Sequence, residues 1–241
     1  MKADEPTDAH WLERHAHVLF DTDERGRMTG LNELDPEGEA PLVFLARGRA
    51  SSLVLFRADA PADIVTACAT AAARIESWDG RATDDRTLEP LRRLVRRWRG
   101  AAVESHGPAF RFGDVRTDSV PDQSVVIDEV NAHLLERHFP YTRSVLSQRA
   151  PVIGVVREGA VVSACYSARR RRDAAEAGVD TIEPYRGRGF AVATVSAWAA
   201  AARRAGVTPL YSTSWDNAAS LRVAAKLRLE AYADTLSIEE A

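Results

Sequence analysis

The chain has 241 residues, of which 45% are hydrophobic, and carries a formal net charge of −3. This length suits one large or two modest domains with a buried core. The slight negative charge excludes a general attraction to nucleic acid or to an anionic membrane surface. The N-terminal residues lack the apolar core of a signal peptide, and no apolar run is long enough to span a bilayer. Neither secretion nor membrane insertion is expected.

Cys68 and Cys165 each stand alone among small or apolar residues, which predicts neither a disulfide framework nor a metal cluster. The histidines have no convincing ligand spacing. His15 and His17, for example, would point to different faces of one helix. No metal is therefore expected, and a reducing cytoplasm is the compartment that isolated thiols favour.

The residues before about position 85 alternate between helical and strand-like patterns. A polar stretch at 77–85 then predicts the end of a semi-independent unit. The expected elements are a helix over 8–20 capped by Asp8, a hairpin of strands 42–46 and 52–56, and a helix over 62–75.

A short helix is expected over 88–99, and its arginines make it strongly basic. One interpretation is a face that binds a phosphate or an acidic substrate. The other is a solvated face, opposite apolar residues that point inward. The helical spacing of those residues favours the second interpretation. They are Leu91, Leu94, Val95 and Trp98.

From Gly107 onward the sequence has alternating strand-like and helical patterns. The expected elements are a strand at 108–112, helices at 125–136 and 142–148, a hairpin of strands 151–156 and 160–168, a strand at 174–181, a helix from 190 through 204, and a strand at 208–214.

A glycine-rich segment, Tyr185-Arg-Gly-Arg-Gly-Phe-Ala191, separates the strand at 174–181 from the helix that follows. Glycines let the backbone come close to a ligand, and a helix N-terminus directs free N–H groups at an anion. A diphosphate is the expected ligand. The sequence does not fit the dinucleotide-binding fingerprint, because Val192 stands where glycine or alanine is needed and the acidic residue about 20 positions later is missing. It does not fit a P-loop either, because no Gly-Lys-Ser/Thr occurs in the chain.

The segment from Arg186 to Ala191 resembles the coenzyme A pyrophosphate loop of the GNAT superfamily of N-acetyltransferases. The resemblance extends to a second block, in which a helix opens with Asn217 and Ser220 and closes at Lys226-Leu227. It implies an α/β fold, with a mixed central sheet flanked by helices, over residues 107–241. A smaller α/β region of unknown role, residues 1–106, would precede it.

Two positions depart from the pattern of this superfamily. Ala224 stands where many members carry a tyrosine that can protonate the departing thiolate. Arg228 replaces the glycine that usually follows the helix, and arginine adopts a left-handed conformation less readily. We therefore expect an altered helix end.

The resemblance implies an acetyl-CoA-dependent N-acetyltransferase whose acceptor is a primary amine of a small molecule or peptide. The alternatives are a non-catalytic acyl-CoA sensor, which Ala224 favours, and an acyl-CoA hydrolase. The acceptor and the oligomeric state stay open. The implied coenzyme contacts are Arg186, Gly187, Arg188, Gly189, Phe190 and Ala191 at the pyrophosphate, backbone N–H groups near Thr181 and Ile182 at the thioester carbonyl, and Asn217 and Ser220 beside the pantetheine.

Glu176 is the first candidate for the catalytic base. It lies four residues from Asp180 on the expected strand, so the two carboxylates face the same side. Glu176 stands between alanines, where partial burial would make it a usable proton acceptor. The alternative is that Glu176 pairs with an arginine at 169–172 across the hairpin. Asp180 is the second candidate base, and Tyr166 and Tyr211 are candidate acids for the thiolate.

Overall fold

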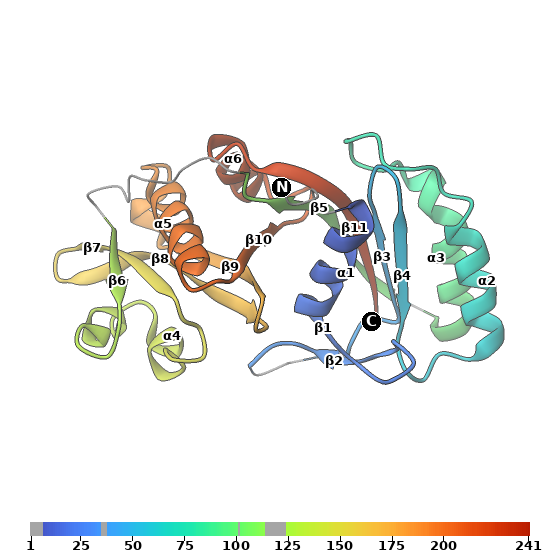
Figure 1. The fold of residues 1–241 in the computed structure, drawn as a ribbon, viewed down its shortest axis with the longest axis horizontal. Helices are drawn as coiled ribbons and strands as arrows, with labels where there is room; N and C mark the ends of the chain where they lie inside the picture. The colour runs from blue at the N-terminus through green and yellow to red at the C-terminus, as the bar shows by residue number, and fades with distance from the viewer. Residues whose placement is uncertain (1–6, 35–37, 101, 114–123) are drawn as a thin grey trace, which may run out of the picture. The chain divides into compact units, whose positions relative to one another are not determined.

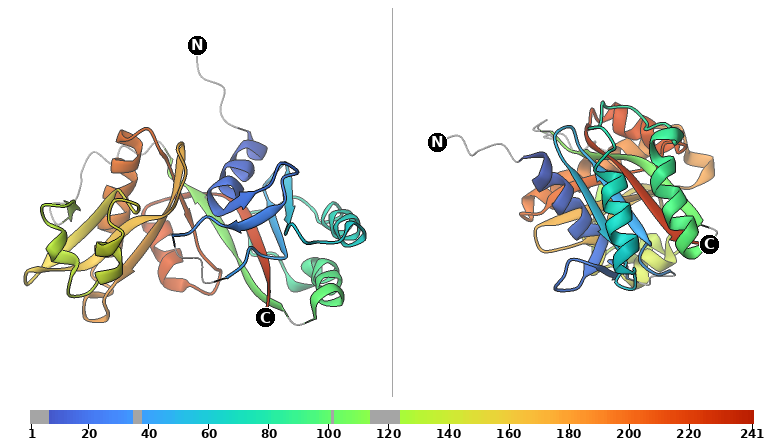
Figure 2. Two further views of the ribbon diagram at one scale, coloured as in Figure 1. Left: turned by 90° about the horizontal axis from the view of Figure 1, so that it is seen from below. Right: turned by 90° about the vertical axis from the view of Figure 1, so that its right-hand side faces the viewer.

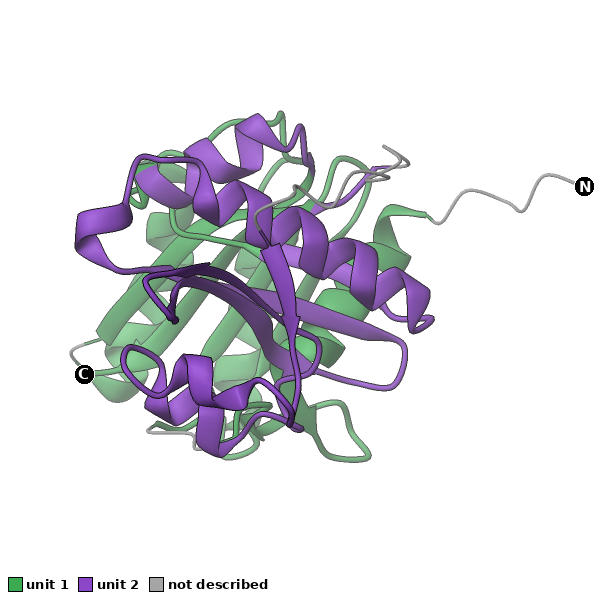
Figure 3. Cartoon of the chain, turned by 90° about the vertical axis from the view of Figure 1, so that its left-hand side faces the viewer, with its two compact units in different colours: residues 1–110, 212–218, 231–241 green, residues 111–211, 219–230 purple. Residues whose placement is uncertain are grey.

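The computed structural model describes residues 7–34, 38–100, 102–113 and 124–241. The chain divides into two compact units, which Figure 3 shows in different colours. Unit 1 comprises residues 1–110, 212–218 and 231–241, and unit 2 comprises residues 111–211 and 219–230. Two short segments from the C-terminal part of the chain thus belong to unit 1.

Unit 1 contains a sheet with the strand order β4-β3-β11-β5. β3 (Val43–Arg47) pairs antiparallel with β4 (Ser52–Phe56), which confirms the predicted hairpin. On its other side β3 pairs antiparallel with β11 (Glu230–Glu240), which the sequence analysis did not predict. β5 spans Ala102–Arg111 and is longer than the strand expected there.

Two helices, α2 (Ala62–Ala72) and α3 (Asp85–Arg99), lie side by side on one face of this sheet (Figures 1 and 2). Their apolar sides share one core with Val43 and Leu45 of β3. The prediction that the polar stretch at 77–85 ends a semi-independent unit is therefore wrong, because the helices on both sides of this stretch belong to the same core.

α1 (Asp8–Leu19) covers the other face of the sheet. The ring of His15 lies 6.3 Å from the ring of Phe44, whose side chain points away from the core that α2 and α3 share. β1 (Phe20–Thr22) and β2 (Met28–Leu31) then form a separate antiparallel pair.

The cap of α1 differs from the expected one. The side chain of Thr7 accepts a hydrogen bond from the backbone N–H of His10, at 3.4 Å, so Thr7 is the N-cap. Asp8 is the first residue of the helix, and its carboxylate accepts a hydrogen bond from the backbone N–H of Ala50, at 2.6 Å. Both side chains are good caps, and a tertiary contact that the sequence does not reveal decides between them.

Unit 2 contains a mixed sheet with the strand order β10-β9-β8-β7-β6. β9 (Ala174–Thr181) pairs parallel with β10 (Thr208–Ser212) and antiparallel with β8 (Ala160–Arg170). β7 (Val152–Arg157) lies between β8 and β6 (Ser124–Ile127), and both pairings are antiparallel. The predicted α/β fold class with a mixed sheet is therefore confirmed.

The prediction of a helix at 125–136 is wrong. Its first residues form the strand β6, because Val125, Val126 and Ile127 are β-branched and suit a pleated surface better than a helix. A short 3-10 helix, η1 (Ala132–Leu135), follows. The second predicted helix begins earlier and ends earlier than expected, as α4 (Pro140–Ser144).

Helices cover the sheet of unit 2. α5 (Phe190–Arg204) packs on one face, where Phe190 and Ala193 join Val155 and Val162 in a buried cluster. Residues of η1 and the segment around α4 form a second buried cluster with β7 and β8. α5 thus confirms the helix predicted through residue 204, and its N-terminus directly follows the glycine-rich loop.

The end of α6 (Ala218–Lys226) is not altered, contrary to the sequence-based expectation. Arg228 itself adopts the left-handed conformation, with φ of 52°. Its N–H donates to the carbonyl of Ala225 at 3.1 Å, and the N–H of Leu229 donates to the carbonyl of Ala224 at 3.0 Å. These two bonds are the pair that closes a helix in the Schellman motif. The helix end keeps its geometry with a strained arginine in place of glycine.

We expect Arg228→Gly to raise the free energy of unfolding by about 0.5–1 kcal/mol, because glycine adopts positive φ without a clash at Cβ. The matched control is Arg222→Gly, at an exposed position inside the same helix. This variant should lower the free energy of unfolding by about 1 kcal/mol. Urea unfolding measures both. Equal destabilisation by the two variants would contradict the strain at Arg228.

Candidate functional site

The glycine-rich loop joins a 3-10 turn, η2 (Glu183–Tyr185), to α5. Gly187 and Gly189 have φ of 76° and 83°, and a Cβ added to either would have no atom within 4 Å. Gly189 is the N-cap of α5 and supplies no side chain to satisfy the first N–H groups of the helix. Within the described residues the loop thus offers free backbone donors at the N-terminus of a 15-residue helix.

Three guanidinium groups border this loop. Arg186 donates from Nε to the carbonyl of Thr181, at 3.0 Å, which ties the loop to the end of β9. The guanidinium of Arg188 lies 5.0 Å from the ring of Tyr185, and that of Arg157 lies 4.8 Å from the ring of Phe190. The positive charge and the backbone donors fit the two phosphates of a diphosphate.

The end of β9 is held by hydrogen bonds to β8. The hydroxyl oxygens of Thr181 and Ser163 are 2.8 Å apart, and the N–H of Ile182 donates to the carbonyl of Val162 at 3.0 Å. The N–H of Ile182 is therefore engaged in the sheet. The assignment of Thr181 and Ile182 to the thioester carbonyl stays a prediction.

Ser220 on α6 contacts a buried tyrosine. Its hydroxyl oxygen lies 2.5 Å from that of Tyr211, which is 2% exposed. Burial raises the pKa of Tyr211, so its phenol keeps its proton at neutral pH. Asn217 precedes α6, and its backbone N–H donates to the carbonyl of Ser214 at 3.2 Å. The coenzyme contacts of Asn217 and Ser220 stay predictions.

Glu176 takes part in a buried ion pair. Its side chain is 3% exposed, and Arg169 donates to it from Nη1 at 2.6 Å. Arg169 faces Glu176 in the register of β8 and β9. This contact is the structural alternative that the sequence left open. The role of Glu176 as the base stays a prediction, although its ion pair favours a structural role.

Asp180, the second carboxylate on β9, is exposed and is bound by a tyrosine. The hydroxyl of Tyr166 donates to Oδ2 of Asp180 at 2.8 Å. Burial, together with the charge of Asp180 and the hydrogen bond to it, raises the pKa of Tyr166 to about 12. Tyr166 therefore remains a donor at neutral pH and holds Asp180 in place.

Gly178 makes this arrangement possible, and the sequence analysis did not single it out. A Cβ at Gly178 would lie 2.5 Å from Cε2 of Tyr166, which faces Gly178 in the register of β8 and β9. The ring of Tyr166 thus occupies the space that any other residue would fill. A glycine inside a predicted strand is the signal that could have indicated a close approach of this kind.

The two interpretations of the basic helix α3 differ in what they require of its apolar residues. Leu91 and Val95 are fully buried, and Leu94 and Trp98 pack against the same core. The predicted inward-facing positions are therefore confirmed.

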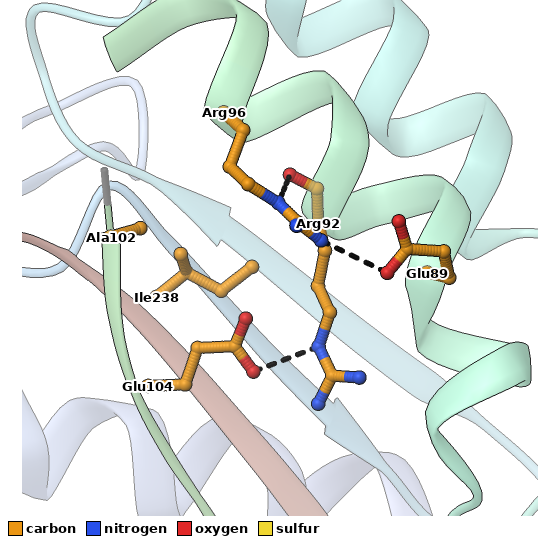
Figure 4. A pocket seen from close by; sticks show the side chains of 6 residues that line it. All are labelled: Glu89, Arg92, Arg96, Ala102, Glu104 and Ile238. Carbon is orange, nitrogen blue, oxygen red and sulfur yellow. Dashed lines mark hydrogen bonds and ion pairs between the residues drawn. The ribbon is translucent and has the colours of Figure 1, made fainter. Parts of the chain in front are cut away.

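The arginines of α3 are partly neutralised by carboxylates. A hollow of about 350 Å³ lies between α3, β5 and β11. Figure 4 shows the side chains that line it. On its walls Arg92 donates to Glu104 at 2.8 Å, and Arg96 donates to Glu89 at 2.9 Å. These pairs favour the interpretation of a solvated, ion-paired face over an anion site.

The family model described as GNAT acetyltransferase matches residues 135–232. This range includes the glycine-rich loop, the strand with Glu176 and Asp180, and the helix α6. The chain is therefore similar to GNAT acetyltransferases over these residues, which contain both sequence blocks that carry the resemblance. No curated protein matches the chain.

Solved structures that resemble the chain include several GNAT-family or GCN5-related acetyltransferases. A GCN5-related N-acetyltransferase-like protein from Streptococcus suis is 19% identical, with a TM-score of 0.49, over 97% of this chain and 100% of that one. A GNAT-family acetyltransferase from Colwellia psychrerythraea is 11% identical, with a TM-score of 0.49, over 78% of this chain and 76% of that one. A GCN5-related N-acetyltransferase from Kribbella flavida is 14% identical, with a TM-score of 0.45. The match covers 62% of this chain and 63% of that one, which is less than two thirds of its length.

Proposed function

We propose that this protein is an acetyl-CoA-dependent N-acetyltransferase that acetylates a primary amine of a small molecule or peptide. The observation that carries the proposal is the loop from Arg186 to Ala191 in a GNAT acetyltransferase domain. Two glycines with positive φ, an uncapped helix N-terminus and flanking arginines suit the diphosphate of coenzyme A. Acetyl-CoA is the co-substrate in this proposal, and no metal takes part.

Acetyl transfer needs a neutral amine, a polarised thioester carbonyl and alignment of the two. The amine nitrogen forms a bond to the carbonyl carbon, and the bond from that carbon to sulfur breaks. An ammonium loses two protons in becoming an amide, the departing thiolate takes up one, and one is released to solvent. One carboxylate near the amine is enough to accept these protons in turn.

Asp180 is the carboxylate that we propose as proton acceptor. It is exposed, and Tyr166 fixes one of its oxygens at 2.8 Å, which leaves Oδ1 to face an amine. Glu176, the first candidate from the sequence, is committed to Arg169 in a buried pair. Geometry therefore supports Asp180 as the base and Glu176 as part of the framework of β9.

Release of free thiol from acetyl-CoA, with and without a panel of primary amines, tests the proposal against its rivals. A transferase releases thiol only when an amine is present and acetylates that amine. A hydrolase releases thiol and acetate without any amine. A sensor, which Ala224 favours, binds acetyl-CoA and releases no thiol. Either of the last two results would overturn the proposal.

Gly189→Ala should weaken acetyl-CoA binding at least tenfold, or about 1.4 kcal/mol, because its methyl group would stand where the diphosphate approaches. Gly206→Ala is the matched control. Gly206 has φ of 74°, also has no atom within 4 Å of an added Cβ, and lies just beyond the other end of α5. Both variants carry the same backbone strain, so calorimetry should show normal affinity in Gly206→Ala alone. Equal acetyl-CoA affinities in the two variants would contradict the proposal that this loop binds the diphosphate.

The described residues offer no feature that calls for another kind of partner. Among the described residues, no helix combines the length and the apolar character needed to cross a membrane. Cys68 and Cys165 are both buried as free thiols. We propose a reducing cytoplasm as the compartment, on the basis of these thiols, and an acceptor that is neither nucleic acid nor lipid.

A further inference from the structure

The guanidinium of Arg149 lies between two aromatic rings of unit 2. It stands 4.2 Å from the ring centre of Tyr166 on β8 and 4.9 Å from that of Tyr141 on α4. Its Nε atom is buried and has no hydrogen-bond partner among the described residues. The side chain of Arg149 is half-buried and is thus held in a defined place, and no carboxylate among the described residues is paired with it.

The rings determine which part of Arg149 a ligand can reach. Aromatic faces stabilise the flat sides of a guanidinium, whereas its N–H groups all lie in its plane. The edge of the guanidinium is therefore the part left for hydrogen bonds. That edge matches a carboxylate, which accepts two parallel hydrogen bonds from it. Tyr141 is 44% exposed, so the cluster reaches solvent.

The same tyrosine also positions a carboxylate. Tyr166 holds Arg149 over its ring and binds Asp180 through its hydroxyl, at 2.8 Å. Among the described residues, Arg149 and Asp180 form no ion pair with each other. A positive and a negative group thus stand on one aromatic side chain, close together but not paired. A ligand that carries both charges would complement the two groups.

We propose that Arg149 and Asp180 together select an acceptor that bears a carboxylate near its amine, the chemical class of free amino acids. The carboxylate of the acceptor binds the edge of Arg149, and its amine faces Asp180. This inference rests on the proposed function and names its substrate class. The amine then lies beside the group that accepts its protons, and Arg149 acts as the specificity determinant.

The test compares each standard L-amino acid with the amine that remains when its carboxylate is removed. Thiol release from acetyl-CoA is measured at equal concentrations of neutral amine, so that differences in amine basicity cancel. In the best pair, kcat/KM should be at least tenfold higher for the amino acid, because the guanidinium edge has a partner only there. Equal values in every pair would overturn the inference.

Arg149→Gln should reduce this ratio toward one, mainly through a higher KM for the amino acid. Arg149→Lys keeps the charge but lacks the two-pronged edge, so it should also lower the ratio and serves if the glutamine variant folds poorly. Arg143→Gln, at an exposed arginine of α4, is the control and should keep the ratio. A ratio that survives in both Arg149 variants would contradict the assignment.

Failure of this inference can be told apart from failure of the proposed function. If amines without a carboxylate are acetylated at the same rate as amino acids, the proposed transferase activity is supported and the proposed role of Arg149 is contradicted. If no acceptor releases thiol, the proposed function falls. Calorimetric titration with the same pairs then still decides: tighter binding of the amino acid, lost in Arg149→Gln, supports the subsite, and equal binding overturns it.

Discussion

Asp180→Asn should lower kcat for amine acetylation by on the order of 100-fold at neutral pH, because the amide cannot accept a proton. The variant keeps the shape of the side chain and leaves the loop at Arg186 untouched, so acetyl-CoA affinity should stay the same. The deficit should shrink as the pH approaches the pKa of the amine, where the acceptor is already neutral. A pH series of kcat measures this dependence.

Glu176→Gln is the matched control, because it makes the same chemical change four residues away on the same strand. Removal of its charge leaves Arg169 without its ion-pair partner. We expect a lower melting temperature and a rate effect that is constant across pH. The opposite pattern, with a pH-dependent loss in Glu176→Gln and none in Asp180→Asn, would make Glu176 the base and contradict the role of Asp180.

Asp234→Asn should destabilise unit 1 by about 3–5 kcal/mol, the range for a buried charge that loses its partner. Asp234 is 3% exposed and lies 3.4 Å from the guanidinium of Arg47, which is 5% exposed. His106 Nε2 and Trp215 Nε1 also lie within hydrogen-bond distance, at 2.9 and 2.8 Å. Without the carboxylate, the charge of Arg47 stays buried and uncompensated.

The pH dependence of stability provides a second test of Asp234. Burial raises its pKa, but hydrogen bonds from His106 and Thr83, the charge of His106 and the bond from Trp215 outweigh burial, so the pKa lies below its usual value. A carboxyl group with a lowered pKa in the folded state stabilises the protein above its unfolded pKa of about 3.9. This stabilisation is lost as the pH falls through the lower, folded value.

Urea unfolding from pH 7 down to pH 3 measures this effect. The free energy of unfolding should fall more steeply below about pH 4 in the wild type than in Asp234→Asn, which lacks the titrating group. Asp63→Asn, at an exposed position of α2, is the control and should follow the wild type within about 0.5 kcal/mol. Parallel curves for Asp234→Asn and the wild type would contradict the account of this network.

The sequence predicted most of unit 2 because local signals there agree with one another. The strand at 174–181, the glycine-rich loop and the helix through Arg204 follow from period, turn chemistry and a long apolar pattern, and all three are present. The prediction of a helix at residues 125–127 was wrong, because a short apolar run does not distinguish a helix from an edge strand. The division of the chain into domains at residue 106 stays a prediction. Unit 1 also includes residues 212–218 and 231–241, which lie far along the chain from its other residues.

The side-chain contacts of the site were harder to predict, because they depend on strand register and on residues that are distant in sequence. Asp234 and Arg47 are 187 positions apart and meet only because β11 pairs with β3. The choice between Glu176 and Asp180 depends on which one pairs with Arg169 and which one accepts the hydrogen bond from Tyr166. Arg149 carries no motif, and its position between two tyrosines follows from packing alone.

The most direct test of the central claim follows the acetyl group itself. The purified full chain is incubated with acetyl-CoA labelled with ¹³C in its acetyl group and with a mixture of primary amines and amino acids, and the products are identified by mass spectrometry. The account predicts labelled N-acetyl product, one free thiol for each acetylated amine, and loss of both in Gly189→Ala at limiting acetyl-CoA. Label found only in acetate, or left in acetyl-CoA, would contradict it.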